Sequence, residues 1–406
     1  MPNPKAATRP DAIRRHNLSV MLGHVHHDGA LTRAELTQRL GVSRSTIGAL
    51  VADLTQLGLV HEVVPSGGEG VGRPSHVVGP HAGGPFAVAV DIDVVHVTIA
   101  AVGLGGEVVA REVVATPPGV DHHDVSALVV AAIPRLQAAG CPQSWPAGVG
   151  VSVPGTVDRH TGRVGVAPNL GWHDSPLGAT LSALAPDGLP VLVGNDADLA
   201  VLAEHQRGSA RGCDDVVYVL GRTGVGAGLI SGGVHLRGHD GHAGEIGHDV
   251  VDASGPPCHC GKNGCVETYI GDGALLARAG RPGPPTERAV AAVFADARAG
   301  DVNALRAVHE VAEALGRAMS GLVNALNPQR VLLGGSLSQL LDVAGSQITS
   351  SLTKYALAAQ GGTVQLVQPA LGDDSSLLGA AEIAFTPLLD DPLSAVGQPA
   401  GHATRA

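Results

Sequence analysis

The sequence is poor in aromatic residues, charged residues and cysteine. Of its 406 residues, only 2% are Phe, Trp or Tyr and 16% are charged, whereas 44% are hydrophobic. Val, Ala and Leu must therefore build the cores, and a highly charged, disordered chain is excluded. The 57 Gly and 27 Pro follow no fixed period, which excludes collagen. At about 150 residues per domain, the length indicates two or three domains.

Two kinds of hydrophobic segment are also missing. No run of 18 or more apolar residues suits a membrane span, and the longest uncharged stretch, from Leu136 to Val157, is broken by three Pro and four Gly. The N-terminus lacks the apolar segment of a signal peptide. Three of the five Cys lie between positions 258 and 265, which fits a metal site in a reduced compartment better than a disulfide framework. We therefore expect a cytoplasmic protein without a membrane segment.

The net charge of −11 argues against nucleic acid as a partner, but the charge is unevenly distributed. The first 78 residues carry 8 Lys and Arg against 6 Asp and Glu, and the remaining residues carry 18 against 31. A basic N-terminal segment on an acidic body indicates a polyanion-binding head. Chance on a solvated surface explains so small an excess equally well.

Residues 11–60 have the apolar spacing of helices around a glycine turn. Thr32 is placed to cap a short helix, with Glu35 completing a capping box, and Gly41 supplies the turn. Ser43 then caps the next helix. The residues expected on the buried faces are Ile13, Leu18, Met21, Leu22, Val25, Leu36, Leu40, Ile47, Leu50, Val51 and Leu54.

This pattern is typical of a helix-turn-helix. Its second helix would place Arg44, Ser45 and Thr46 in the major groove of DNA. The β-like runs 59–64 and 75–78 enclose a Gly-rich loop that resembles the wing of a winged helix, where Arg73 would contact a phosphate or the minor groove. A three-helix packing domain gives the same helical spacing, but the wing, the caps and the basic bias together favour DNA binding. Pro and Gly between 65 and 85 indicate a linker.

Residues 85–385 predict two α/β lobes. Three strands, with a Gly turn at 103–106, precede a helix at 121–139 and a buried strand. A strand, an acidic turn and a helix then cover 190–208, and a strand hairpin with further helices and a strand completes the second lobe.

One local pattern predicts a metal site. His248, Cys258, Cys260 and Cys265 offer one imidazole and three thiolates, a closed tetrahedral set for structural zinc (Zn2+) that leaves no position for a catalytic water. Cys141 and Cys213 are expected to be small buried hydrophobes.

Polar groups gather around the predicted end of an apolar strand. Asn195 and Asp196 follow this strand, where ligands bind in α/β folds, and Glu245 and Glu267 flank the metal pattern. Carboxylates and a carboxamide around one cleft suit a sugar, since each can take paired hydroxyls. Taken singly, each residue is better explained as a cap or a surface charge.

Together these motifs resemble the ROK family (repressors, open reading frames and sugar kinases), within the actin-like sugar-kinase superfamily. The matching segments are VSVPGTVD, APNLGW, GNDADLAVLAE, GVGAGLISGG, GHAGEIGH, CHCGKNGCVE and PQRVLLGGS, in the family's order. The N-terminal segment is similar to the winged helix of the family's transcriptional regulators. The resemblance implies a sugar cleft formed by Asn195, Asp196, Glu245, His248, Glu267, Gly155 and Asn169.

The resemblance also has one departure. The aspartate at the position of Asp196 activates the sugar hydroxyl in kinase members, which carry a DxGGT-like loop against the ATP phosphates. Here that stretch runs from Asp91 to His96, without glycine, and Asp93 places negative charge near the phosphates. Phosphoryl transfer depends on positioning and charge stabilisation, so we expect kinase activity to be lost.

We therefore expect a two-lobed, actin-like (ribonuclease H-like) α/β body with an N-terminal winged helix-turn-helix. The expected boundaries are 1–80 for the head and linker, 85–195 for the first lobe with helix 374–386 returning to it, 196–373 for the second lobe, and 387–406 for a flexible tail. The predicted function is a transcriptional regulator, a dimer or tetramer that binds an inverted-repeat operator and responds to a sugar or phosphosugar. A bifunctional sugar kinase with a DNA-binding head and a DNA-binding architectural protein are the alternatives.

Overall fold

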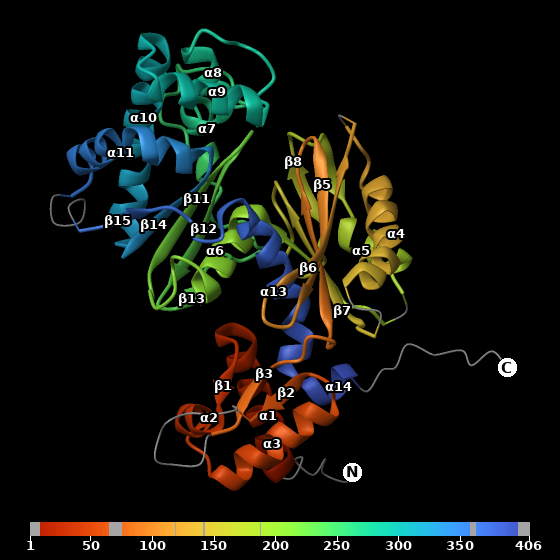
Figure 1. Cartoon of the computed structure of the whole chain (residues 1–406). Coiled ribbons are helices and arrows are strands. Elements are labelled where there is room, and N and C mark those ends of the chain that lie inside the picture. Colours follow the sequence, from red (N-terminus) through yellow and green to blue (C-terminus); the bar gives the residue numbers. More distant parts are fainter. Residues whose placement is uncertain are drawn as a thin grey trace, which may run out of the picture.

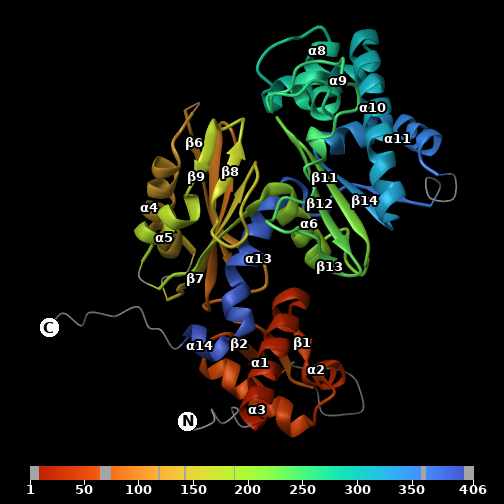
Figure 2. The same cartoon turned by 180° about the vertical axis from the view of Figure 1, so that it is seen from behind.

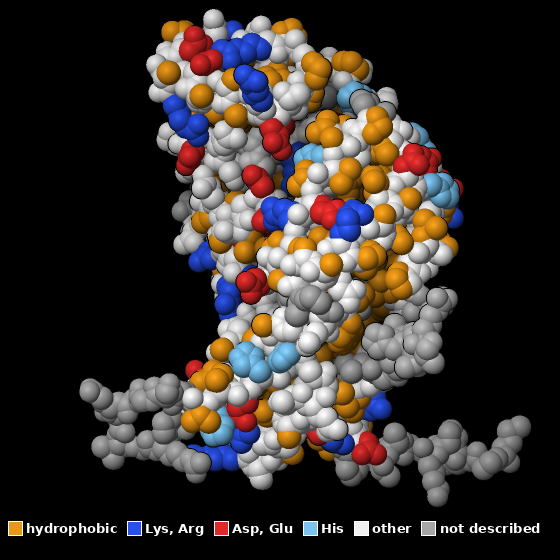
Figure 3. All heavy atoms as spheres, turned by 45° about the vertical axis from the view of Figure 1, so that its right-hand side comes forward, with side chains coloured by type: hydrophobic (Ala, Val, Ile, Leu, Met, Phe, Trp, Pro, Cys, Tyr) orange, Lys and Arg blue, Asp and Glu red, His pale blue; other side chains and the backbone are white. Residues whose placement is uncertain are grey.

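The chain forms a small head at one end of a two-lobed body (Figure 1). The computed structural model describes residues 9–64, 75–117, 119–140, 143–186, 188–357 and 363–396. Arg73 and Cys141 lie outside these ranges. Seen from behind, the two lobes stand side by side above the head (Figure 2). On the face shown in Figure 3, hydrophobic and uncharged side chains cover most of the body, as the low charge content requires.

The head is a helix-turn-helix with a small sheet. It comprises α1 (Arg9–Asp28), β1 (Leu31–Thr32), α2 (Arg33–Leu40), α3 (Arg44–Gln56), β2 (Val60–Val63) and β3 (Val77–Pro80), with sheet order β1-β3-β2. The predicted caps are confirmed: Thr32 and Glu35 form a capping box, Gly41 is left-handed with φ 65°, and the Ser43 hydroxyl accepts from the backbone of Thr46. The strand β3 occupies part of the expected linker.

The predicted buried face of the head is confirmed, with Leu40 partly buried, except at one end. The fully buried side chains of α1 begin at Leu18, whereas Ile13 is 57% exposed. The prediction that Ile13 belongs to the buried face was wrong, because the first turns of α1 extend beyond the core of the head.

The first lobe is a five-stranded sheet of order β10-β7-β4-β5-β6. Its strands β10, β7 and β4 are parallel, and β4, β5 and β6 are antiparallel. Helices α4 and α5 pack together in this lobe, and β8 and β9 form a separate ribbon. The elements are β4 (Phe86–Ile92), β5 (His96–Gly103), β6 (Val108–Ala115), α4 (His122–Gly140), β7 (Pro146–Val153), β8 (Val164–Ala167), β9 (Trp172–Ser175), α5 (Leu177–Leu184) and β10 (Val191–Asn195).

The second lobe has a sheet of order β13-β12-β11-β14-β15 and a layer of helices. Its hydrophobic cluster lies between this sheet and α8 to α11. The elements are α6 (Asp196–Arg207), β11 (Val216–Gly221), β12 (Val225–Ser231), β13 (Val234–His235), η1 (Ile246–His248), α7 (Glu267–Ile270), α8 (Asp272–Arg278), α9 (Glu287–Arg298), α10 (Val302–Leu326), β14 (Arg330–Gly335), α11 (Ser336–Tyr355), β15 (Gln365–Val367) and η2 (Gly372–Asp374).

Helix α13 (Ser375–Asp390) returns to the first lobe and lies directly on strand β7. A Cβ at Gly150 would lie 1.8 Å from the backbone oxygen of Ala380, so only glycine permits this approach. The same helix packs along α6 and continues toward the head.

The expectation of a flexible tail from residue 387 is wrong for residues 387–396. Helix α13 continues to Asp390, and α14 (Pro392–Val396) follows. Leu388 is buried, and Leu393 packs against the hydrophobic cluster that also contains Leu18 and Leu22 of α1. These contacts order the segment, because the apolar side chains complete the core of the head. Within the described ranges, no helix combines the length and hydropathy needed to cross a bilayer.

Candidate functional site

Polar side chains from both lobes line one pocket between them. Its walls are formed by the end of β10, the start of α6, the β4–β5 and β11–β12 turns, and the segment around η1. All seven residues that the sequence assigned to a sugar cleft contribute to this lining: Gly155, Asn169, Asn195, Asp196, Glu245, His248 and Glu267. Their role as sugar ligands stays a prediction.

Most of the hydrogen bonds of the Asn195 side chain go to the backbone around the pocket. Its Oδ1 accepts hydrogen bonds from the backbone N–H groups of Ala197 and Asp198, at 2.9 and 3.1 Å, and so caps α6. Its Nδ2 donates to the backbone oxygen of Gly155 at 3.1 Å. An amide nitrogen has two protons, so Asn195 retains one donor for a ligand.

Asp196, which is buried, and Glu245, which is partly buried, are carboxyl groups whose pKa values are raised. Burial raises the pKa of Asp196 to about 7, with Arg222 opposing and Asp91 adding to the rise. Burial likewise raises the pKa of Glu245 to about 7, reinforced by Asp196 and Asp198. Both groups can therefore exchange a proton when a ligand hydroxyl binds.

An arginine of the second lobe bridges to carboxylates of the first. Arg222 Nη1 lies 3.3 Å from Asp91 Oδ2 and 3.7 Å from Asp93 Oδ2. Burial disfavours the charge of Arg222, but Asp91 and Asp196 raise its pKa above the ordinary value. The Ser152 hydroxyl donates to the other oxygen of Asp91 at 2.7 Å. These contacts hold the two lobes together beside Asp196.

Arg222 and Asp91 are not among the site residues that the sequence predicts. Asp91 lies in an apolar strand, and Arg222 stands at the end of β11 next to the glycine-rich turn. The sequence feature that could have indicated both residues is a charged side chain within an otherwise glycine-rich or apolar stretch. Their pairing depends on how the lobes meet, which the sequence pattern does not contain.

The predicted metal ligands converge. The donor atoms of His248, Cys258, Cys260 and Cys265 all lie within 4.8 Å of one another. His248 Nδ1 is 3.7 Å from Cys258 Sγ, and the sulfurs of Cys260 and Cys265 are 3.6 Å apart. Tetrahedral zinc with bonds of about 2.3 Å to sulfur requires ligand separations of about 3.8 Å, so the set fits a metal ion.

The thiol chemistry of the cluster supports this fit. Burial and the neighbouring thiols of Cys260 and Cys258 raise the pKa of Cys265 to about 12, and a cation would relieve this by stabilising thiolates. Cys213, outside the cluster, is buried as expected.

Glu267 connects the cysteine cluster with the pocket. Its Oε2 accepts from the backbone N–H of Val225 at 3.2 Å, and its Oε1 lies 3.9 Å from Cys258 Sγ. The loop that carries the three cysteines is therefore in contact with two pocket residues, His248 and Glu267.

The predicted recognition helix presents an unpaired arginine. Arg44 and Ser45 are exposed, Thr46 is partly buried, and all three lie at the start of α3. In the head, Arg14, Arg33 and Arg39 each pair with an acidic side chain. Within the described ranges Arg44 has no such partner, so its charge is available to an external anion.

Comparisons with known proteins agree with this two-part architecture. The ROK family matches residues 87–386, and the MarR family matches residues 19–70. A glucokinase from Halalkalibacterium halodurans is 32% identical over 312 residues, covering 72% of this chain and 92% of the glucokinase.

Regulators match nearly the whole chain. A xylose repressor from Bacillus subtilis is 26% identical over 385 residues, covering 93% of this chain and 97% of the repressor. The crystal structure of a ROK family transcriptional regulator, a homologue of the E. coli MLC protein, superposes with a TM-score of 0.77 at 25% identity, covering 95% of this chain and 99% of that structure.

Proposed function

Because this chain belongs to the ROK family, we propose that it is a sugar-responsive transcriptional repressor without kinase activity. The observation that carries this proposal is that one chain combines a winged helix, whose recognition helix exposes Arg44, with an interlobe pocket lined by carboxylates. The repressor relatives extend over both parts. In this role Asp196, Glu245 and Glu267 accept hydrogen bonds from sugar hydroxyls, with Gly155, Asn169, Asn195 and His248 completing the site.

The β4–β5 turn supports the loss of kinase activity. Asp93, Val94 and Val95 replace the small residues that let a backbone approach phosphates. Arg222 pairs with Asp91 and Asp93 beside Asp196, and these carboxylates repel a nucleotide phosphate. The glucokinase relatives and the retained Asp196 favour the alternative, a bifunctional kinase. A coupled ATP assay with D-glucose and D-xylose distinguishes the two, since turnover of either sugar would support the kinase.

The cysteine cluster is proposed to hold one structural zinc ion through His248, Cys258, Cys260 and Cys265. A closed ligand set supplies folding free energy and fixes the loop. Here it would orient His248 and Glu267 toward the pocket.

We expect the DNA to be an inverted repeat bound by a dimer or a dimer of dimers, because the symmetry of an operator matches that of the protein. Arg44, Ser45 and Thr46 would contact bases, and Arg73 the backbone or minor groove. The expected domain limits of 1–80, 85–195 and 196–373 remain our proposal for how the chain divides.

Removing the exposed arginine at the start of the recognition helix, Arg44, should weaken operator binding. We expect Arg44→Ala to cost about 1–3 kcal/mol and to relax specificity at one base position. The measurement is fluorescence anisotropy with a duplex selected from a random-sequence library. Arg135→Ala is the control, because it removes the same charge from an exposed ion pair of the body. If Arg44→Ala and Arg135→Ala give equal affinities and specificities, α3 is not the recognition helix.

Sugar binding should strengthen as the pH rises from 6 to 8. The pKa values of Asp196 and Glu245 are both raised to about 7, so the free pocket holds a proton at pH 6 that must leave before a carboxylate accepts from a hydroxyl. One such proton weakens binding by about tenfold for each pH unit below the pKa. Isothermal titration at pH 6, 7 and 8 measures this slope. A dissociation constant that is independent of pH would show that neither group must ionise.

A further inference from the structure

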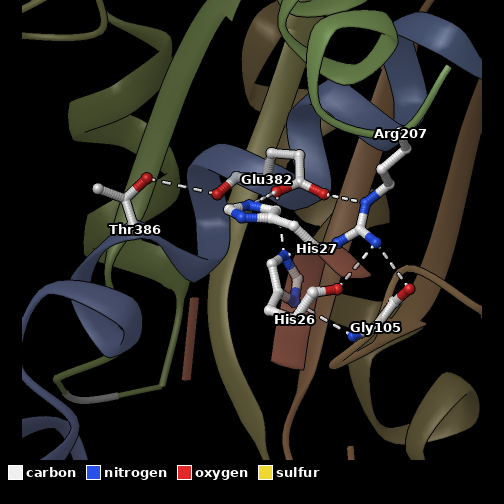
Figure 4. Close-up of polar contacts among 6 residues, drawn as sticks. All are labelled: His26, His27, Gly105, Arg207, Glu382 and Thr386. Carbon is white, nitrogen blue, oxygen red and sulfur yellow. Dashed lines mark hydrogen bonds and ion pairs between the residues drawn. The ribbon is translucent and has the colours of Figure 1, made fainter. Parts of the chain in front are cut away.

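The head and the body meet at a cluster of buried polar side chains (Figure 4). His26 and His27 come from α1 of the head, Arg207 ends α6, Glu382 lies in α13, and Gly105 lies in the β5–β6 turn. The side chains of His26, Glu382 and Arg207 are 1%, 3% and 10% exposed. Such groups are rarely buried unless each finds a partner.

Within this cluster every charged group is engaged. Arg207 Nε donates to Glu382 Oε1, and Arg207 Nη1 donates to the backbone oxygens of His26 and Gly105, at 3.0 and 2.8 Å. Glu382 Oε2 lies 3.0 Å from His26 Nε2 and 3.3 Å from His27 Nε2. The Arg207 guanidinium thus contacts α13, helix α1 of the head and the β5–β6 turn of the first lobe.

Both ring nitrogens of His26 are engaged. The backbone N–H of Gly105 donates to His26 Nδ1 at 3.1 Å, and His26 Nε2 lies 3.0 Å from Glu382 Oε2. Burial lowers the pKa of His26, whereas contacts with His26 and Arg207 hold the pKa of Glu382 well below its ordinary value despite burial. The donor atoms of His26, His27 and Glu382 lie close enough to hold a metal. Arg207 Nη2, 2.7 Å from His26 Nε2, opposes a second cation there.

The same two body helices extend from this cluster to the pocket. Helix α6 begins at Asp196 and ends at Arg207, and its 12 residues span about 18 Å. The Ser376 hydroxyl of α13 donates to the backbone oxygen of Asp196 at 3.1 Å. The start of α6 therefore lines the pocket with α13 in contact behind it, and the other ends of both helices hold the head.

The two helices are tightly packed against each other. A Cβ at Gly379 would lie 2.0 Å from the backbone oxygen of Leu199, so the backbones of α13 and α6 are in direct contact. The buried carboxylate of Glu204 on α6 accepts from the Ser375 hydroxyl at 2.9 Å and from the Leu371 backbone at 2.8 Å. A packed pair of this kind transmits displacement because close-packed interiors deform little.

We propose that Arg207, Glu382 and His26 form the joint through which the pocket controls the position of the DNA-binding head. A change in lobe angle at Asp196 displaces the far ends of α6 and α13, and the joint passes this displacement to α1. The three residues are positioning residues that contact neither sugar nor DNA. The sugar arm of this inference rests on the proposed function.

The test compares operator affinity with and without D-xylose, D-glucose or N-acetyl-D-glucosamine, in wild type and joint variants. His26→Leu removes both hydrogen bonds of the ring, and His26→Gln retains a polar group toward Glu382. Removing one charge alone would leave its buried partner unpaired and destabilise the protein. The second joint variant is therefore the double substitution Arg207→Met/Glu382→Met. Arg15→Gln is the matched control, since Arg15 on α1 also contacts the body, but through an exposed pair with Asp391.

The readout is the ratio of operator dissociation constants with and without sugar. We expect at least about fivefold in wild type, Arg15→Gln and His26→Gln, the lower end of typical couplings. The ratio should fall below about twofold in His26→Leu and in the double variant, with sugar affinity unchanged. A merely structural contact would alter both dissociation constants equally and leave the ratio intact.

A second arm needs no sugar. Arg222→Gln breaks the interlobe bridge to Asp91 and Asp93, and we expect it to change operator affinity in the wild-type background but not beside His26→Leu. If Arg222→Gln changes operator affinity as expected but no sugar changes it, the proposal of a sugar effector is wrong and the proposal of the joint is supported. If the sugar ratio survives in both folded joint variants, the joint is overturned and the proposed function stands. If neither sugar nor Arg222→Gln alters operator affinity in wild type, both are overturned.

Discussion

Cys260→Ser is expected to release the metal and to lower the stability of the protein by more than a typical single substitution. Cys260 is exposed, so exchanging sulfur for oxygen there disturbs little packing, and the cost must come through the metal. A complete structural zinc site is worth about 10–16 kcal/mol in zinc-finger peptides. Partial loss should therefore exceed the ~1 kcal/mol of an average substitution.

The measurement pairs metal analysis with thermal unfolding of reduced protein. Wild type should carry about one zinc per chain, the number that one tetrahedral set holds. Cys213→Ser is the matched control, since Cys213 is a buried thiol outside the cluster and should affect packing alone. Wild-type protein without metal, or a Cys260→Ser protein with full metal content, would contradict the assignment.

Asp196→Asn should abolish most of the sugar response while preserving operator binding without sugar. The substitution keeps the shape of the side chain but replaces a carboxylate acceptor by an amide, and a hydrogen bond to a charged group contributes about 1.5–3 kcal/mol. Sugar affinity should therefore fall by roughly 10–150-fold. The head, which Asp196 does not contact, should bind DNA as before.

The matched control is Asp198→Asn. Asp198 lies two residues further along α6 and is also buried, but it faces His235 at 3.3 Å rather than the pocket. Its replacement should leave the sugar affinity within about threefold, because Asp198 does not line the pocket and acts on it only through a secondary electrostatic effect on Glu245. A normal sugar response in Asp196→Asn would contradict the cleft assignment. Failure to bind the operator even without sugar would show that Asp196 stabilises the body instead.

Features determined by short stretches of chain were predictable. The capping box of Thr32 and Glu35 and the left-handed Gly41 depend on neighbouring residues, and the structure confirms them. The spacing of Cys258, Cys260 and Cys265 likewise contains most of the geometry of the metal loop. The family resemblance supplied the arrangement of the lobes, which periodicity alone does not give.

Features that join distant parts of the chain were missed. His26 and Glu382 are 356 positions apart, and Arg222 reaches Asp91 only because the lobes close on each other. The sequence predicts a tail from residue 387, because the short helix Pro392–Val396 has little periodicity, yet Leu388 near the end of α13 lies in a core shared with the head. Each depends on tertiary packing, which a local pattern does not encode.

The central claim is that a sugar bound by the body changes the affinity of the head for DNA. Its most direct test is the operator dissociation constant measured during titration with D-xylose, D-glucose and N-acetyl-D-glucosamine. We expect at least one of these sugars to shift the constant by about 5–150-fold, the range of typical coupling free energies, and none to be phosphorylated when ATP is present. An operator affinity that no sugar alters, together with ATP-dependent turnover of any of them, would contradict the account and identify the chain as a sugar kinase.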